Sequence, residues 1–144
     1  MKSQAIEATQ VADEVKLMFL PAMFGPNHMI NGESRLFALA RAFAPEHYTG
    51  GEWLYFDLSN GGHYAAPKTP ERLTLTIPEI HFERDLSNHA AGIVICLFAL
   101  GQMAGEAHEA GHDADVRNFV ERYEQLLEFV SEHDEREAIR AAID

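Results

Sequence analysis

Residues 53–67 decide the fold, and their sequence is WLYFDLSNGGHYAAP. Residues 52–58 are rich in aromatic side chains and predict a strand, and residues 63–66 predict a second one. The Asn-Gly-Gly run between them predicts a hairpin turn, because these residues adopt positive φ at little cost. Residues 72–77, RLTLTI, alternate between apolar and polar side chains, which is typical of a strand with one buried face. These segments predict a small antiparallel sheet of about three strands.

Helices are expected before this sheet. Between residues 6 and 20 the apolar side chains recur at loosely helical spacing, until Pro21 interrupts the pattern. A second helix is predicted over residues 32–43, and it ends before Pro45 because the residue that precedes a proline is disfavoured in the α region.

Helices are also expected after the sheet. Residues 90–104 are apolar nearly all round, which predicts a central buried helix with Ser87 or Asn88 as its N-cap. Residues 115–132 repeat their apolar side chains with a period of 3.6, and residues 135–143 predict a short helical tail. The fold class is therefore α+β, with a small antiparallel sheet in the middle and helices before and after packed on it. Residues 1–144 form a single domain.

Composition and charge narrow the class of protein. Of the 144 residues 47% are hydrophobic, and 23 acidic against 11 basic side chains give a formal charge of −12. This balance argues against direct binding to nucleic acid or to an anionic membrane surface, because both need clustered Lys and Arg. Cys96 is the single cysteine, and the apolar run 90–101 is about half the roughly 20 residues that span a bilayer. We expect a cytoplasmic protein.

The acidic residues are concentrated in one part of the chain. Residues 106–144 hold twelve acids and four bases, which is −8 of the total −12. Acidic side chains recur every four residues along the predicted helix, a spacing that costs a few tenths of a kcal/mol per pair. This stripe is either a solvated face or a surface for a partner. The candidate partner-binding acids are Glu121, Glu124, Glu128, Glu132 and Asp144.

The hairpin offers a second candidate surface. Asn60, Gly61, Gly62 and the nearby Tyr64 could form a shaped contact surface or a small-ligand site. The alternative is a tight turn whose neighbouring aromatic side chains belong to the core.

One motif suggests an enzyme. His108, Glu109 and His112 match the H-E-x-x-H pattern, which on a helix places two imidazoles on one face to bind zinc. The alternative function is therefore a zinc-dependent hydrolase. However, the glycine-containing segment 105–113 predicts a connection between helices, and the sequence indicates no third ligand. Cys96 lies in an apolar run, where a reactive thiolate is disfavoured. We expect no catalytic residue, no metal and no cofactor.

Residues 53–67 and 90–104 together resemble the ArdB/KlcA family of antirestriction proteins. The likeness extends upstream to Phe19-Leu-Pro and downstream to Arg122-Tyr123 and residues 140–144, so it covers nearly the whole chain. The resemblance implies a plasmid or mobile-element protein that blocks type I restriction-modification enzymes and so protects incoming DNA. It implies no catalytic residues.

The expected partner is the type I restriction-modification complex or an associated host protein, bound through protein contacts. The acidic C-terminal part could imitate DNA phosphates, although residues 1–105 carry only −4, from eleven acids and seven bases. Two alternatives to this DNA mimicry remain: contact with the partner through the hairpin, and an indirect route of inhibition.

Overall fold

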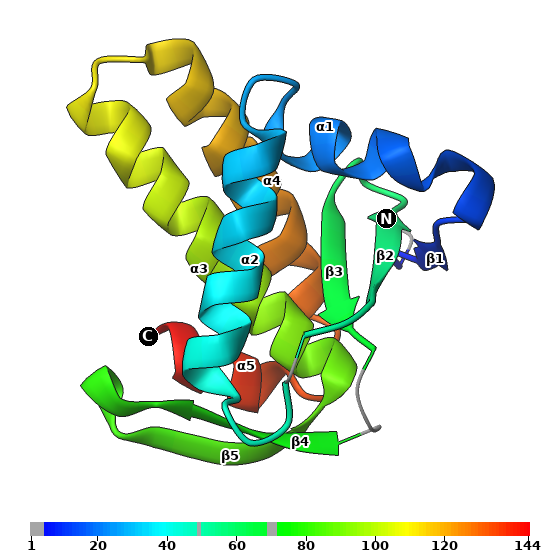
Figure 1. Cartoon of the computed structure of the whole chain (residues 1–144), viewed down its shortest axis with the longest axis vertical. Coiled ribbons are helices and arrows are strands. Elements are labelled where there is room, and N and C mark those ends of the chain that lie inside the picture. The colour runs from blue at the N-terminus through cyan, green and yellow to red at the C-terminus, as the bar shows by residue number, and fades with distance from the viewer. Residues whose placement is uncertain (1–4, 49, 69–71) are drawn as a thin grey trace.

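Helix α3 (Asn88–Glu109) forms the centre of the fold (Figure 1). The computed structural model describes residues 5–48, 50–68 and 72–144. The Ser87 side chain caps α3 by accepting a hydrogen bond from the Ala90 amide at 3.0 Å, so the predicted cap and central helix are confirmed. By length and composition α3 could cross a membrane, but two thirds of its most apolar stretch is buried, as in the core helix of a folded domain.

The predicted hairpin is confirmed as the main part of a three-stranded antiparallel sheet. Strands β2 (Trp53–Leu58) and β3 (His63–Pro67) pair with Asp57 opposite His63. Strand β1 (Ala8–Gln10) pairs with the other edge of β2. Strand β3 packs directly against α3, and an added Cβ at Gly92 would lie 2.3 Å from the Ala65 carbonyl oxygen.

The third predicted strand belongs to a separate sheet. Strand β4 (Arg72–Ile77) pairs antiparallel with β5 (Phe82–Ser87), after a short 3₁₀ turn, η2 (Pro78–Ile80). The described residues thus form a three-stranded and a two-stranded sheet. The sequence of β5, FERDLS, places three charged residues in a row between buried Phe82 and Leu86, which masks the alternation typical of strands.

The expectation of a helix over residues 6–20 is wrong for its first half. After β1 the chain forms a 3₁₀ helix, η1 (Asp13–Met18), and then helix α1 (Phe19–Phe24). Pro21 lies in the first turn of α1, where its missing amide hydrogen is not needed, so it does not end the helix. Helix α2 (Met29–Phe43) begins three residues before the predicted start and ends as predicted.

The C-terminal third consists of helices that pack on α3. Helix α3 continues to Glu109, so the expected connection over 105–113 is only three residues long, before α4 (Asp113–Val130). Helix α5 (Arg136–Ile143) lies beside β5 at the lower end of Figure 1 and also contacts α3. The α+β fold class is therefore confirmed, with one core to which helices α1 to α5 and strands β2 to β5 contribute buried side chains.

Candidate functional site

Helix α4 presents the predicted acidic stripe to solvent. Its buried side chains are Phe119, Leu126 and Val130, whereas Glu121, Glu124 and Glu128 are exposed. At 100° per residue the three glutamates share an arc of about 60° on the side opposite the core. Because α4 ends at Val130, Glu132 lies in the turn that follows, where it is also exposed.

The tip of the β2–β3 hairpin is attached to this same helix. The Asn60 Nδ2 donates to the Gln125 carbonyl oxygen at 2.9 Å, and the Gln125 Nε2 donates to the Asn60 carbonyl oxygen at 3.2 Å. The Asn60 Oδ1 also accepts from the Gly62 amide at 3.0 Å, which closes the turn. The hairpin and the acidic stripe, which the sequence presents as alternatives, are therefore neighbours on one surface.

Arg122 joins this surface to the N-terminal part of the chain. Its Nη1 donates to the Gly61 carbonyl oxygen at 3.3 Å and to the Gln125 Oε1 at 3.1 Å, and its Nε donates to the Ala22 carbonyl oxygen at 3.2 Å. Sequence reasoning missed Arg122 and Gln125. The available signal was a base and an amide, three residues apart, that interrupt the acidic stripe between Glu121 and Glu128.

A positive φ at one position and a close contact at the other explain the two glycines of the turn. Gly61 has a φ of +92°, in the region that favours glycine. At Gly62 an added Cβ would lie 2.9 Å from the Cβ of Gln125, so the turn approaches α4 too closely for a larger residue. The hairpin tip is therefore a fixed part of the α4 surface.

Tyr64 lies inside the protein, which corrects the expectation that it contributes to a contact surface. Its ring is only 3% exposed and stacks on Phe56 and Phe129, with centroids 4.8 and 5.8 Å away. Its hydroxyl is hydrogen-bonded to the Nδ1 of His89 at 3.0 Å, and burial raises the pKa of Tyr64 to about 12. Tyr64 therefore belongs to the core.

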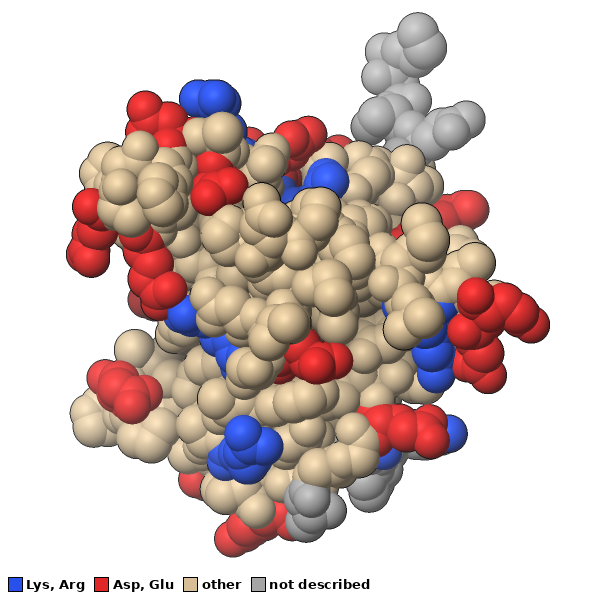
Figure 2. Space-filling model, turned by 45° about the horizontal axis from the view of Figure 1, so that its top comes forward, with Lys and Arg blue, Asp and Glu red and all other residues tan. Residues whose placement is uncertain are grey.

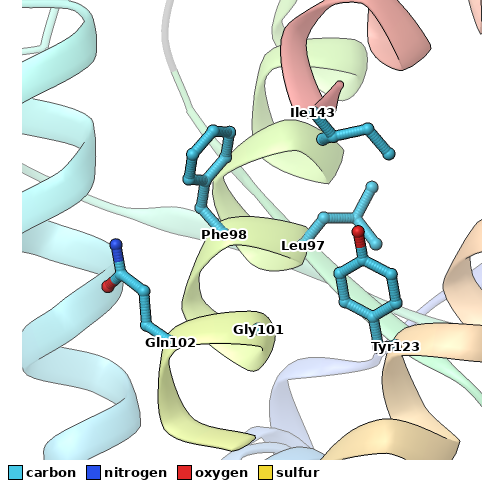
Figure 3. A pocket seen from close by; sticks show the side chains of 6 residues that line it. All are labelled: Leu97, Phe98, Gly101, Gln102, Tyr123 and Ile143. Carbon is cyan, nitrogen blue, oxygen red and sulfur yellow. The ribbon is translucent and has the colours of Figure 1, made fainter. Parts of the chain in front are cut away.

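Asp144 lies apart from the acidic stripe, beside a small apolar pocket. Burial raises the pKa of Tyr123, and the charge of Asp144 raises it further, so these two residues are close together. Tyr123 lies about 100° or more round α4 from the glutamates. The pocket has a volume of about 280 Å³ (Figure 3). It is lined by Leu97, Phe98, Gly101, Gln102, Tyr123 and Ile143.

The geometry does not support the zinc-hydrolase alternative. Helix α3 ends at Glu109, and Gly111, with a φ of +76°, separates His108 from His112. The two imidazoles therefore do not lie on one helical face. His112 instead lies 3.9 Å from a carboxylate oxygen of Asp115. Over the described part of the chain, no group of three His, Cys, Asp or Glu residues has a geometry suited to a metal ion.

Cys96 is also unsuited to nucleophilic chemistry. It is fully buried where α3 contacts β3, and its Sγ accepts a hydrogen bond from the Ala65 amide at 3.3 Å. Burial raises the pKa of the Cys96 thiol to about 12, so the reactive thiolate is not formed near neutral pH.

The charges are unevenly distributed over the surface. On the face shown in Figure 2, acidic side chains lie mainly around the rim, and the middle is largely uncharged. Helix α4 lies behind α2 and α3 in the view of Figure 1.

Three comparisons with known proteins place the chain in a family. Residues 46–144 match the family model described as "Antirestriction protein". The chain is 43% identical over 143 residues to "Antirestriction protein KlcA" of Escherichia coli, covering 99% of this chain and 98% of that protein. It is 34% identical over 129 residues to "Putative antirestriction protein YubI" of Escherichia coli (strain K12), covering 90% and 89%.

A solved structure matches over the full length. The TM-score is 0.86 with 41% identity, covering 100% of this chain and 99% of the other. That work is described as showing that the KlcA and ArdB proteins have "a novel fold and antirestriction activity against Type I DNA restriction systems in vivo but not in vitro". The expected resemblance is confirmed, and the chain belongs to the antirestriction protein family.

Proposed function

We propose that this chain counteracts type I restriction-modification enzymes in the cell, through protein contacts and not through catalysis. The observation that carries the proposal is the full-length match, at a TM-score of 0.86, to proteins described as active against these systems. The interrupted His108–His112 pair and the high pKa of Cys96 support contact over catalysis.

We propose that the contact surface is the α4 stripe together with the hairpin tip. Glu121, Glu124 and Glu128 form an exposed acidic arc next to a turn that is held rigidly at Gln125. A surface of this kind suits a basic partner, because opposite charges speed and orient association. The partner is a type I restriction-modification complex or a host protein associated with it.

The proposal puts the protein in the cytoplasm, where it would protect plasmid or other mobile DNA that enters the cell. Activity of KlcA and ArdB in vivo but not in vitro supports a requirement for a cellular component in addition to the restriction enzyme. Simple occupation of the DNA-binding cleft by a phosphate mimic would need no such component, so an indirect route is the better-supported mechanism.

The central experiment measures restriction in living cells. Unmodified phage is plated on cells that carry a type I system, with and without expression of this chain. We expect the plating efficiency to rise towards that of already modified phage, which serves as the control together with a host that lacks restriction. An unchanged plating efficiency, with the protein expressed and soluble, would contradict the proposal.

A second experiment tests the α4 surface. The double variant Glu124→Lys and Glu128→Lys should lose protection while keeping its circular-dichroism spectrum, because both side chains are exposed. The matched control reverses two exposed acids of the β4–β5 sheet region, Glu79→Lys and Glu83→Lys, and should protect normally. Full protection by the α4 variant would exclude this face as the contact surface and leave the antirestriction activity itself unaffected.

A further inference from the structure

Exposed apolar side chains gather on the 3₁₀ helix η1, which has no buried residue. Val15 is 50% exposed, Leu17 is 93% exposed and Met18 is 70% exposed. We call these three residues the η1 patch. A large apolar side chain that stays in water gives up the favourable free energy of burial, so three of them within four residues indicate a surface that another molecule covers.

A pocket of about 280 Å³ adjoins the η1 patch. Most of its lining side chains are apolar, and Asp57 and His63 of the β2–β3 hairpin add polar groups. Its lining residues are Val11, Val15, Met18, Phe19, Ala22, Asp57 and His63. The ring of Phe19 fixes this apolar lining, because it stacks on Tyr55 at a centroid distance of 4.5 Å and contacts the edge of His63 at 5.6 Å.

The uncompensated charge around the η1 patch is negative. The Lys16 ammonium is paired with Asp13 at 3.0 Å. The Arg122 guanidinium donates to neutral backbone and amide oxygens, so it keeps its charge and offsets one of the two carboxylates of Glu14 and Asp57. Within the part of the chain that the structure describes, Glu14 and Asp57 have no Lys or Arg partner.

Asp57 keeps its net charge although it is hydrogen-bonded. Its Oδ1 lies 2.8 Å from the Nδ1 of His63, and burial lowers the pKa of His63, so the imidazole is neutral at pH 7. The Asp57 side chain lines the pocket and is 58% exposed, so it can accept a further hydrogen bond.

We propose that the η1 patch and its pocket bind a protein segment that inserts an apolar side chain between Val15, Met18 and Phe19 and places a Lys or Arg against Asp57. Charge favours this occupant over the others. A second copy of the chain would bring the Glu14 and Asp57 carboxylates of both copies together, and an anionic lipid surface would be repelled by the same groups. The site is distinct from the α4 stripe.

The test uses the full purified chain with an amphipathic helical peptide of leucine and lysine as the probe. Methyl NMR signals of Val15, Leu17 and Met18 should shift on titration, whereas that of Ile30, which is 74% exposed on α2, should not. A peptide with glutamate in place of lysine should not bind. Shifts confined to methyl groups of α4, such as that of Val120, would overturn the proposal.

Matched variants make the test quantitative. The double variant Leu17→Ser and Met18→Ser should weaken binding by about tenfold or more, because two apolar side chains that the partner would cover are lost. Asp57→Asn should weaken binding and reduce its dependence on salt. The control Ile30→Ser should leave the affinity unchanged. Equal affinity for all four proteins would contradict the proposal.

Two further measurements address the competing occupants. Sedimentation equilibrium that shows a Leu17-dependent dimer would overturn the proposal in favour of a second copy. If the protein floats together with vesicles of zwitterionic and anionic lipid, the proposal would be overturned in favour of a membrane. The inference is independent of the antirestriction proposal. The purified chain can fail to bind the peptide while protection in cells persists, and it can bind the peptide while protection in cells is absent.

Discussion

Asn60 uses its side chain twice, once within its own turn and once across to α4. Its Oδ1 accepts from the Gly62 amide at 3.0 Å, and its Nδ2 donates to the Gln125 carbonyl oxygen at 2.9 Å. A single amide therefore sets both the shape of the hairpin tip and its position on the helix.

The first prediction concerns this residue. Asn60→Ala should lower the free energy of unfolding by about 1–3 kcal/mol, because two part-buried hydrogen bonds are lost at once. Urea denaturation measures the change. The control Asn118→Ala alters an exposed residue of α4 and should stay within about 0.5 kcal/mol of the wild type. Equal effects of the two substitutions would mean that the turn contributes nothing to the docking of the hairpin.

Two histidines make stability depend on pH. Burial lowers the pKa of His63 and of His89, and His133 adds to the effect on His89. In the unfolded chain both imidazoles titrate near 6.5, so below that pH the unfolded state binds more protons than the folded one. The two neutral imidazoles therefore contribute fully to the free energy of unfolding above pH 6.5. This contribution is lost as the pH falls through their pKa values in the folded protein.

The second prediction follows from this loss of stability at lower pH. The melting temperature should fall between pH 7.5 and pH 5.5, and the fall should be smaller in His89→Gln. The ring of His89 packs at the edge of Phe56, so each variant is compared with itself across pH and not with the wild type at one pH. An identical pH dependence in wild type and variant would show that His89 does not titrate differently on folding.

At the scale of the elements, helix α3 approaches strand β3 very closely. Gly92 allows it, because an added Cβ would lie 2.3 Å from the Ala65 carbonyl oxygen and 2.6 Å from the Ala66 Cα. These are backbone atoms of a paired strand, which cannot move aside as a flexible side chain could.

The third prediction compares two glycines of the same helix. Gly92→Ala should destabilise the protein by about 1–3 kcal/mol or more, because the methyl group overpacks the contact between helix and strand. Gly105→Ala has open space around it and is exposed, so it should stabilise by about 0.5–1 kcal/mol through helix propensity. Thermal unfolding of both variants checks the pair, and a similar change in both would contradict the assigned close approach.

The elements differ in how well the sequence predicts them, for physical reasons. Helix α3 and the β2–β3 hairpin are predictable because their own sequences contain both the apolar pattern of the element and the residues that cap the helix or form the turn. Strand β5 is not, because its middle faces solvent and carries three charges, and β1 forms only by pairing with β2. The stripe on α4 follows from spacing, but its contact with Asn60 depends on tertiary packing that no local pattern encodes.

The molecule as a whole carries a formal charge of −12, and −8 of it lies in residues 106–144. Few of these acids are neutralised across elements. Arg35 bridges to Glu106 at 2.6 Å and Arg84 to Glu137 at 3.3 Å, both on the surface, where such pairs contribute little. Repulsion among the remaining carboxylates therefore opposes folding at low ionic strength.

The fourth prediction is that salt stabilises the protein. The melting temperature should rise between about 10 and 150 mM NaCl, as the screening length falls from roughly 30 to 8 Å. The variant with Glu124→Lys and Glu128→Lys should show a smaller rise, because its net charge is reduced by four. A melting temperature that falls with added salt would mean that attractive ion pairs outweigh the repulsion.

The cap of α3 has a consequence for the order of folding. Ser87, which begins the central helix, also bonds through its backbone amide and its hydroxyl to the Glu135 carboxylate, 48 residues further along the chain. During synthesis the ribosome must therefore make residue 135 before the start of the helix has all its partners. Contacts so distant in sequence are slow to form. We therefore expect the nascent chain to reach its final packing late, after most of the helices have already emerged.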